Sequence, residues 1–160
     1  MNNYLNSIFN LEGKVAVVTG AGGHLCGEMA RGFAKAGCKV VVADLRIEKA
    51  NDVVKQITDA GNNYVLAIEA DVSTKEGHAK VLTETLKTFD TVDILINGAG
   101  INGSTPFFEI SLEEWHSILN SQITSTFLGC QIFGEYMVKK GHGAIINISS
   151  ASAGPPCLLY

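Results

Sequence analysis

Five short apolar runs constrain the fold of this chain more than any other feature. Each run is rich in β-branched residues and nearly continuous in apolar character: KVAVVTG (14–20), CKVVVAD (38–44), NYVLAIEAD (63–71), VDILINGAG (92–100) and GAIINISS (143–150). Such runs are typical of strands buried on both faces, as in a parallel sheet that helices cover from both sides. The sequence therefore predicts five buried parallel strands.

Helical stretches separate these runs. Apolar residues at helical spacing form one face with Leu25, Met29, Phe33 and Ala36, and another with Ile47, Ala50, Val54 and Ile57. The capping-box pattern Ser-x-x-Glu occurs at 73–76 and at 111–114, and the second opens a long predicted helix over 111–140 that Gly141 and Gly143 close. Strands and helices in alternation, joined by right-handed crossovers, predict an α/β fold with a doubly wound parallel sheet in a single domain over residues 1–160.

Composition excludes several classes of function. The net charge is −4 and basic residues are scattered, so we expect no nucleic-acid partner. No apolar stretch approaches the roughly 20 residues that span a bilayer, and the first residues lack a signal-peptide pattern. We expect a cytoplasmic protein that contacts no membrane.

Cysteines and histidines give no sign of a metal site. The cysteines show no C-x-x-C spacing and are expected to be reduced thiols: Cys26, Cys38, Cys130 and Cys157. The histidines are far apart and form no H-E-x-x-H pattern: His24, His78, His116 and His142.

The residues after the first run suggest a ligand site. In a doubly wound sheet, ligands bind beyond the carboxyl ends of the strands, where the strand order reverses. The stretch TGAGGHLCG (19–27) has glycines at 20, 22, 23 and 27, so a diphosphate could approach the backbone at the start of a helix. The alternative is a tight turn without a ligand. The stretch is neither G-x-G-x-x-G, because Leu25 replaces the third glycine, nor a P-loop.

Carboxylates follow the second and third runs. Asp44 could accept both hydrogen bonds of a ribose diol and repel a 2′-phosphate, which favours NAD over NADP, although the nearby Arg46 keeps NADP open. Its alternative role is the N-cap of a helix over 46–60. Asp71 and Val72 could reach an adenine edge, and a turn or cap beside Ser73 is the alternative.

Small residues follow the fourth run. Asn97, Gly98, Ala99 and Gly100 leave room for a flat ring or a ribose against the backbone. The alternative is a plain loop rich in turn formers.

Taken in order, these motifs closely resemble the short-chain dehydrogenase/reductase family. Thr-Gly after the first strand, Asp after the second, Asp-Val after the third, NGAG after the fourth and ISS after the fifth match the family over about residues 10 to 156. The stretch FNLEGKVAVVTGAGG and the NGAG variant are most similar to bacterial members that act on sugar acids or polyols, such as D-mannonate oxidoreductase-like proteins.

The resemblance implies a Rossmann-like fold and hydride transfer between NAD(P) and a small-molecule carbonyl or alcohol. It implies cofactor contacts from Thr19, Gly20, Gly22, Gly23, His24, Leu25, Asp44, Leu45, Asp71, Val72, Asn97, Gly98, Ala99 and Gly100. Ser150 matches the serine that positions the substrate oxygen, and Gln122 aligns with an asparagine that supports a proton-relay water. No metal is implied. Full-length members are expected to be homo-oligomers, an expectation that weakens for a shorter chain.

Two residues depart from the glycine pattern of the family. His24 and Cys26 stand at glycine positions, where a side chain on left-handed backbone would cost roughly 1–2 kcal/mol. The bulk of His24 would also crowd a diphosphate. Cys26 at a helix start is either a reactive thiol of lowered pKa or, as we favour, a small filler.

The last residues depart furthest from the family. There, a tyrosine about thirteen residues beyond the serine begins a Y-x-x-x-K turn, whose spacing puts a lysine beside the phenol. Tyr160 is ten residues beyond Ser150, and no lysine follows it, so we do not expect it to be the catalytic tyrosine. The sequence is interpreted as a truncated member that lacks the last two strands of the family.

A truncated sheet predicts marginal stability, because the fifth strand would become an uncovered edge. Two functions stay open: an NAD(P)-dependent oxidoreductase by descent, or a catalytically inactive nucleotide-binding remnant whose exposed edge could recruit a partner. A methyltransferase on a similar sheet is disfavoured, because Thr19-Gly20, NGAG and ISS are not its signature.

Overall fold

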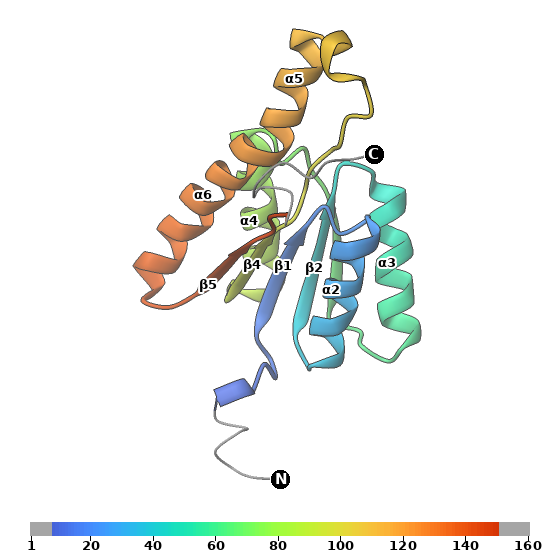
Figure 1. The fold of residues 1–160 in the computed structure, drawn as a ribbon. Helices are drawn as coiled ribbons and strands as arrows, with labels where there is room; N and C mark the ends of the chain where they lie inside the picture. The colour runs from blue at the N-terminus through green and yellow to red at the C-terminus, as the bar shows by residue number, and fades with distance from the viewer. Residues whose placement is uncertain (1–7, 151–160) are drawn as a thin grey trace.

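The computed structural model describes residues 8–150 and contains a five-stranded sheet between two layers of helices (Figure 1). All the strand pairs are parallel, and the order is β3-β2-β1-β4-β5. The strands are β1 (Val15–Thr19), β2 (Lys39–Asp44), β3 (Val65–Glu69), β4 (Ile94–Asn97) and β5 (Ala144–Asn147). The order reverses between β1 and β4, which is where such sheets bind ligands. The predicted fold class is confirmed.

Helices cover the sheet from both sides. The α-helices are α2 (His24–Lys35), α3 (Ile47–Asp59), α4 (Lys75–Phe89), α5 (Leu112–Leu119) and α6 (Ser125–Lys140). Helices α2 and α3 lie on one face, and α4 and α6 lie on the other (Figure 1). A 3₁₀ turn (Phe107–Glu109) precedes α5, which projects away from the sheet.

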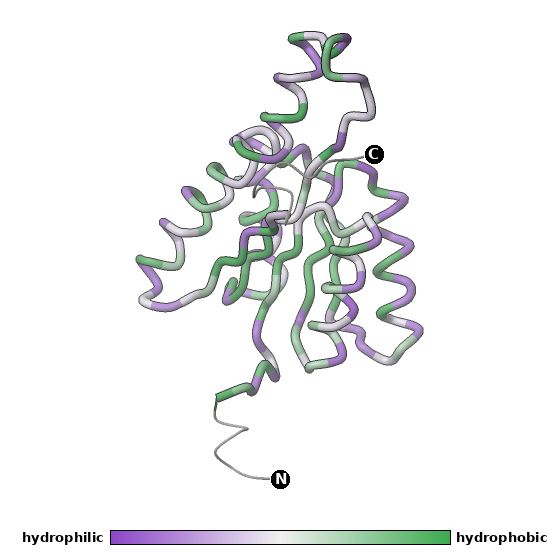
Figure 2. The backbone as a smooth tube through the Cα atoms, in the orientation of Figure 1, coloured by the Kyte–Doolittle hydropathy of each residue, from purple (hydrophilic) through white to green (hydrophobic). Residues whose placement is uncertain are grey.

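Two hydrophobic cores form because successive strand residues point to opposite faces. On β1, Ala16 and Val18 pack with the helices α2 and α3, whereas Val15 and Val17 pack with α4 and α6. Strands β1, β2 and β4 are almost wholly buried and form the hydrophobic centre of the chain in Figure 2.

The edge strands are less buried than predicted. Strand β3 is mostly half-buried, and β5 is largely exposed, with Ile146 48% exposed. The expectation of burial on both faces is therefore wrong for these two strands, because each has a neighbouring strand on one side only.

Side-chain hydrogen bonds also join β1 to β4 at both ends of the strand pair. At the amino-terminal end, the Asp93 carboxylate accepts hydrogen bonds from the Val15 amide (2.9 Å) and from the Lys140 ammonium (2.7 Å). At the other end, the Thr19 hydroxyl donates to the Ile96 carbonyl (3.2 Å) and accepts from the Gly98 amide (3.1 Å). These bonds reinforce the register of the two central strands.

Helix α2 turns a different face to the sheet than the sequence predicted. Cys26, Ala30 and Ala34 are buried, whereas Leu25 is 55% exposed. The small residues let the helix lie close to the strands, and Met29 and Phe33 pack at the margin of the core.

One predicted helix start is shifted by a residue. Thr74, rather than Ser73, caps α4, and its hydroxyl accepts the Gly77 amide (3.0 Å). Ser73 instead donates its hydroxyl to Asp71 (2.7 Å). The second predicted start is confirmed, since Ser111 accepts the Glu114 amide and caps α5.

The long helix predicted over 111–140 is not regular. A π-helical segment, Asn120–Thr124, separates α5 from α6, and such segments are frequent at functional sites. Gly141, with φ of 87°, ends α6 as predicted.

Candidate functional site

A cavity of about 680 Å³ lies beyond the carboxyl ends of the central strands. Most of the residues predicted to bind a cofactor line it: Gly20, Gly23, His24, Leu25, Asp44, Leu45, Asp71, Val72, Gly98, Ala99 and Gly100. The sequence analysis missed further lining residues, which follow strand ends or adjoin Gln122: Ala70, Ser73, Ile101, Asn102 and Ser121.

The glycine-rich turn after β1 packs closely against the loop after β4. Gly20 has φ of +67°, and a Cβ atom there would lie 2.7 Å from the Cα atom of Ala99. This position therefore requires glycine for both its conformation and its space. The turn and the loop form neighbouring walls of the cavity.

The two departures from the glycine pattern cause no backbone strain. His24 and Cys26 belong to α2, and among the described residues Asp90 alone combines a side chain with positive φ. The left-handed backbone considered from the sequence is therefore not found at either position. His24 is exposed at the first position of the helix and lines the cavity.

Asp44, the last residue of β2, binds the glycine-rich turn that follows β1. Its side chain is 8% exposed, and its two oxygens accept the amide hydrogens of Gly22 (2.9 Å) and Arg46 (3.0 Å). The residue at the N-cap of α3 is Arg46, so the alternative assignment of Asp44 to that position is wrong. A carboxylate thus stands at the cavity with both oxygens engaged by main-chain donors.

Asp71 forms a turn at the end of β3. Its carboxylate accepts hydrogen bonds from the amide (3.0 Å) and the hydroxyl (2.7 Å) of Ser73. The turn role considered from the sequence is present, and the contact of Asp71 and Val72 with an adenine ring stays a prediction.

Some predicted cofactor residues do not line the cavity. Thr19 is fully buried and joins β1 to β4, and Gly22 donates its amide to Asp44. Asn97 is 3% exposed, and its amide donates to the side chain of Asn147 on β5 (2.9 Å). A cofactor contact from these three residues stays a prediction.

Cys26 is a packing residue. Its thiol is buried and donates to the Gly98 carbonyl at 3.5 Å. Burial, reinforced by the charge of Asp44, raises the pKa of the Cys26 thiol. A lowered pKa would have indicated a reactive thiol, so the interpretation of Cys26 as a filler is confirmed.

The π-helical segment holds the loop after β4. Ser121 accepts the Ile101 amide (3.2 Å), and the side-chain amide of Gln122 donates to the Ile101 carbonyl (2.7 Å). Both main-chain groups of one loop residue are thus bound by adjacent side chains. Gln122 also packs on Gly100, although it is not itself part of the cavity wall.

Ser150 is exposed and lies three residues beyond the end of β5. The predicted strand over 143–150 is therefore shorter, although the Ile148 amide still donates to the Asn97 carbonyl of β4 (2.9 Å). The role of Ser150 toward a substrate stays a prediction. Tyr160 and Cys157 lie outside the described residues.

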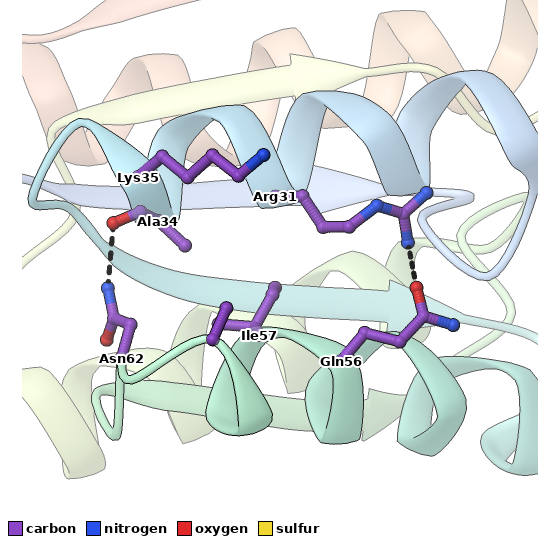
Figure 3. Close-up of a pocket in the computed structure, with 7 residues that line it drawn as sticks. Arg31, Ala34, Lys35, Gln56, Ile57 and Asn62 are labelled. Atoms are coloured by element: carbon purple, nitrogen blue, oxygen red, sulfur yellow. Dashed lines mark hydrogen bonds between the residues drawn. The ribbon is translucent and has the colours of Figure 1, made fainter.

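A second, much smaller cavity of about 60 Å³ lies between α2 and α3 (Figure 3). Arg31 donates to Gln56 across it (2.7 Å), and Asn62 donates to the Ala34 carbonyl (3.0 Å). It has room for little more than water, and its polar groups bond to each other, so it is not a second candidate site.

The part of the chain that the structure describes contains no cluster of three or more residues suited to hold a metal ion. Cys26, Cys38 and Cys130 are free thiols, as predicted. Within residues 8–150, no helix has the length and apolar character to cross a bilayer.

Comparison with known proteins finds one matching family model and relatives that are dehydrogenases. The short chain dehydrogenase family model matches residues 14–158. A 2-dehydro-3-deoxy-D-gluconate 5-dehydrogenase of Dickeya dadantii is 38% identical over 89% of this chain and 55% of its own length. A D-threitol dehydrogenase of Mycolicibacterium smegmatis is 35% identical over 91% of this chain and 55% of its own length.

Solved structures show the same fold. A 7α-hydroxysteroid dehydrogenase in complex with NADH and 7-oxo glycochenodeoxycholic acid superposes with a TM-score of 0.88 at 32% identity, covering 98% of this chain and 60% of the other. A 3-ketoacyl-(acyl-carrier-protein) reductase from Brucella melitensis in complex with NADH gives 0.82 at 34% identity, covering 92% and 61%. The chain spans little more than half the length of these relatives. It belongs to the short-chain dehydrogenase family of NAD(P)-dependent oxidoreductases.

Proposed function

We propose that this chain binds a nicotinamide dinucleotide as part of an oxidoreductase that acts on a small carbonyl or alcohol substrate. The observation that carries the proposal is the cavity between Gly20 and Asp44 at the reversal of strand order. The glycine turn offers backbone amides to a diphosphate, and the loop Gly98–Gly100 offers a flat wall for the nicotinamide half.

NAD is the preferred form in this proposal. The Asp44 carboxylate lies in the cavity wall, and a ribose diol could replace its present amide donors. A 2′-phosphate there would face this charge, and the nearest cation is Arg46, whose Nε lies 3.9 Å from the carboxylate. Two relatives of known structure are complexes with NADH, which supports the same assignment.

A sugar acid or a polyol is the proposed substrate class. Relatives that act on a deoxy-gluconate derivative and on threitol support it. The bound nicotinamide would supply the hydride chemistry. Ser150 would donate a hydrogen bond to the substrate oxygen, while Gln122 would hold the loop at Ile101 against the nicotinamide.

One observation favours a second candidate, dinucleotide binding without turnover. In the described range, neither a tyrosine nor a lysine lines the cavity, so its described wall does not contain the tyrosine–lysine pair that the family resemblance implies. Reduction of a carbonyl needs a proton as well as a hydride, and that pair would supply the proton.

Fluorescence titration with NADH, followed by turnover assays over sugar acids and polyols, tests both candidates. Saturable binding with turnover supports the oxidoreductase, and saturable binding without turnover supports the second candidate. The Gly20→Val variant is the control, because its side chain would overlap the Ala99 main chain and displace the turn from the cavity wall. No saturable binding by the unaltered chain would refute both.

A further inference from the structure

His24 occupies an unusual place in the cavity wall. It is the first residue of α2, it is exposed, and it lies between Gly23 and Leu25, which also line the cavity. The N-cap Gly23 has no side chain to bind the first amides of the helix. An ionisable ring therefore stands where those main-chain donors face the cavity.

Positive charge is scarce in this wall. Among the described lining residues, only His24 and Arg46 carry or can gain a positive charge. Arg46 lies beside Asp44, at the end proposed for the adenosine ribose. Arg31, on the same helix as His24, is engaged by Glu28 (2.7 Å) and Gln56 (2.7 Å). Lys49 packs on Gly22 but does not line the cavity, so His24 is the cavity-lining residue of the glycine turn that can gain a positive charge.

We infer that His24 binds the diphosphate of the dinucleotide in its protonated form, which makes cofactor affinity depend on pH. The inference rests on the proposed dinucleotide site. An imidazole typically changes its charge between about pH 5 and 8, whereas a diphosphate diester keeps its charge over this range. Affinity should therefore rise as the pH falls and His24 gains a proton.

Other charged groups also lie near His24. They are Glu28 on α2, Asp44 and Arg46 after β2, Lys49 on α3 and Asp71 after β3. Ordinary carboxylates are ionised, and lysine and arginine are protonated, across about pH 6 to 8. The Cys26 thiol stays neutral, because burial raises its pKa.

Calorimetric titration with ADP-ribose and with adenosine, each at about pH 6 and about pH 8, tests the inference. ADP-ribose contains the diphosphate diester, and adenosine lacks it. We expect the unaltered chain to bind ADP-ribose about threefold more tightly at the lower pH, in keeping with an exposed ion pair, and to bind adenosine equally at both.

Three variants make the test specific. His24→Gln keeps a hydrogen-bond donor without the charge and should lose the pH dependence. His24→Arg keeps a charge at both pH values and should bind tightly at both. His116→Gln, at another exposed histidine on α5, is the matched control and should keep the pH dependence.

The outcomes separate this inference from the proposed function. If the unaltered chain binds no ADP-ribose at either pH, the dinucleotide site itself is wrong. If it binds ADP-ribose equally at both pH values, or if His24→Gln keeps the pH dependence, the role of His24 is overturned while the site stands.

Discussion

The carboxylate of Asp44 accepts the amide hydrogen of Gly22 at 2.9 Å, so the residue that ends β2 closes the turn that follows β1. This bond places a negative charge beside the turn, in a side chain that is 8% exposed. The proposed preference for NAD depends on that charge.

The first prediction concerns Asp44→Asn. The amide keeps one acceptor oxygen but removes the charge, so the affinity for NADH should fall about tenfold, as for the loss of a hydrogen bond to a charged group. The affinity for NADPH should fall less, because the 2′-phosphate no longer meets a carboxylate. Paired fluorescence titrations measure the ratio, and Asp52→Asn, at an exposed carboxylate of α3 that does not line the cavity, is the control. An unchanged ratio would show that Asp44 does not select the cofactor.

The second prediction concerns the contact between Gly98 and Cys26. A Cβ atom at Gly98 would overlap the Cys26 sulfur, while its other neighbours lie at 3.3 Å or beyond. Gly98→Ala should therefore lower the free energy of unfolding by about 1–3 kcal/mol. Cys26→Ala removes the sulfur, so Gly98→Ala should cost much less in its presence. Urea unfolding of both single variants and the double variant measures the coupling, and simple additivity would contradict it.

The third prediction concerns the buried His78. Its ring is fully buried between α4 and α6, and Nε2 lies 2.9 Å from the Ser125 carbonyl. Burial lowers the pKa of His78, although hydrogen bonding to Ser125 acts in the opposite direction. The unfolded chain therefore binds the proton at a higher pH than the folded chain does. Stability should be insensitive to this group above about pH 6.5 and should fall as the pH drops below it.

Urea unfolding at about pH 7.5 and about pH 5.5 tests this sign. In His78→Gln, the loss of stability between the two pH values should be smaller, even if the variant is less stable at both. His116→Gln, which changes an exposed ring, should behave like the unaltered chain. An equal pH slope in His78→Gln and the unaltered chain would contradict the prediction.

The fourth prediction concerns exposed apolar side chains on α5, on the π-helical segment and at the start of α6. Leu112, Trp115, Ile123 and Phe127 are each more than half exposed, and β5 is an edge strand. Surfaces of this kind promote association. The 160-residue chain should self-associate as its concentration rises, and Phe127→Glu should weaken that association in sedimentation velocity.

Tyr64→Ser is the control for the fourth prediction, because this exposed aromatic residue precedes β3, at the opposite edge of the sheet from β5. A sharp, reversible thermal transition of a strictly monomeric chain would contradict both the association and the marginal stability predicted from the sequence.

The alternation of strands with helices and the position of the cavity were predictable, because apolar runs and the small residues after them follow from backbone requirements. The buried face of α2 was not predictable, since the buried Ala30 and Ala34 are less hydrophobic than the exposed Leu25. The inward direction of Asn97 follows from period-two alternation, as it lies two residues after Leu95, and it could have been read from the sequence.

The π-helical segment was not predictable from local pattern. No pattern in residues 120–124 distinguishes a π-helical segment from an α-helix, and the bonds of Ser121 and Gln122 to Ile101 join parts of the chain about twenty residues apart. Such features depend on tertiary contacts that periodicity does not encode.

Glycines of the turn after β1 and of the loop after β4 line the cavity, so its shape depends on how β1 and β4 align. Val18 is paired with Ile96, and this pairing brings Gly20 against Ala99. If β1 shifted by one residue against β4, the glycine turn would no longer meet the loop after β4, and the cavity would be lost although every side chain is unchanged. Mutations that remove the hydrogen bonds of Asp93 or Thr19 should thus impair ligand binding through the alignment of the two strands.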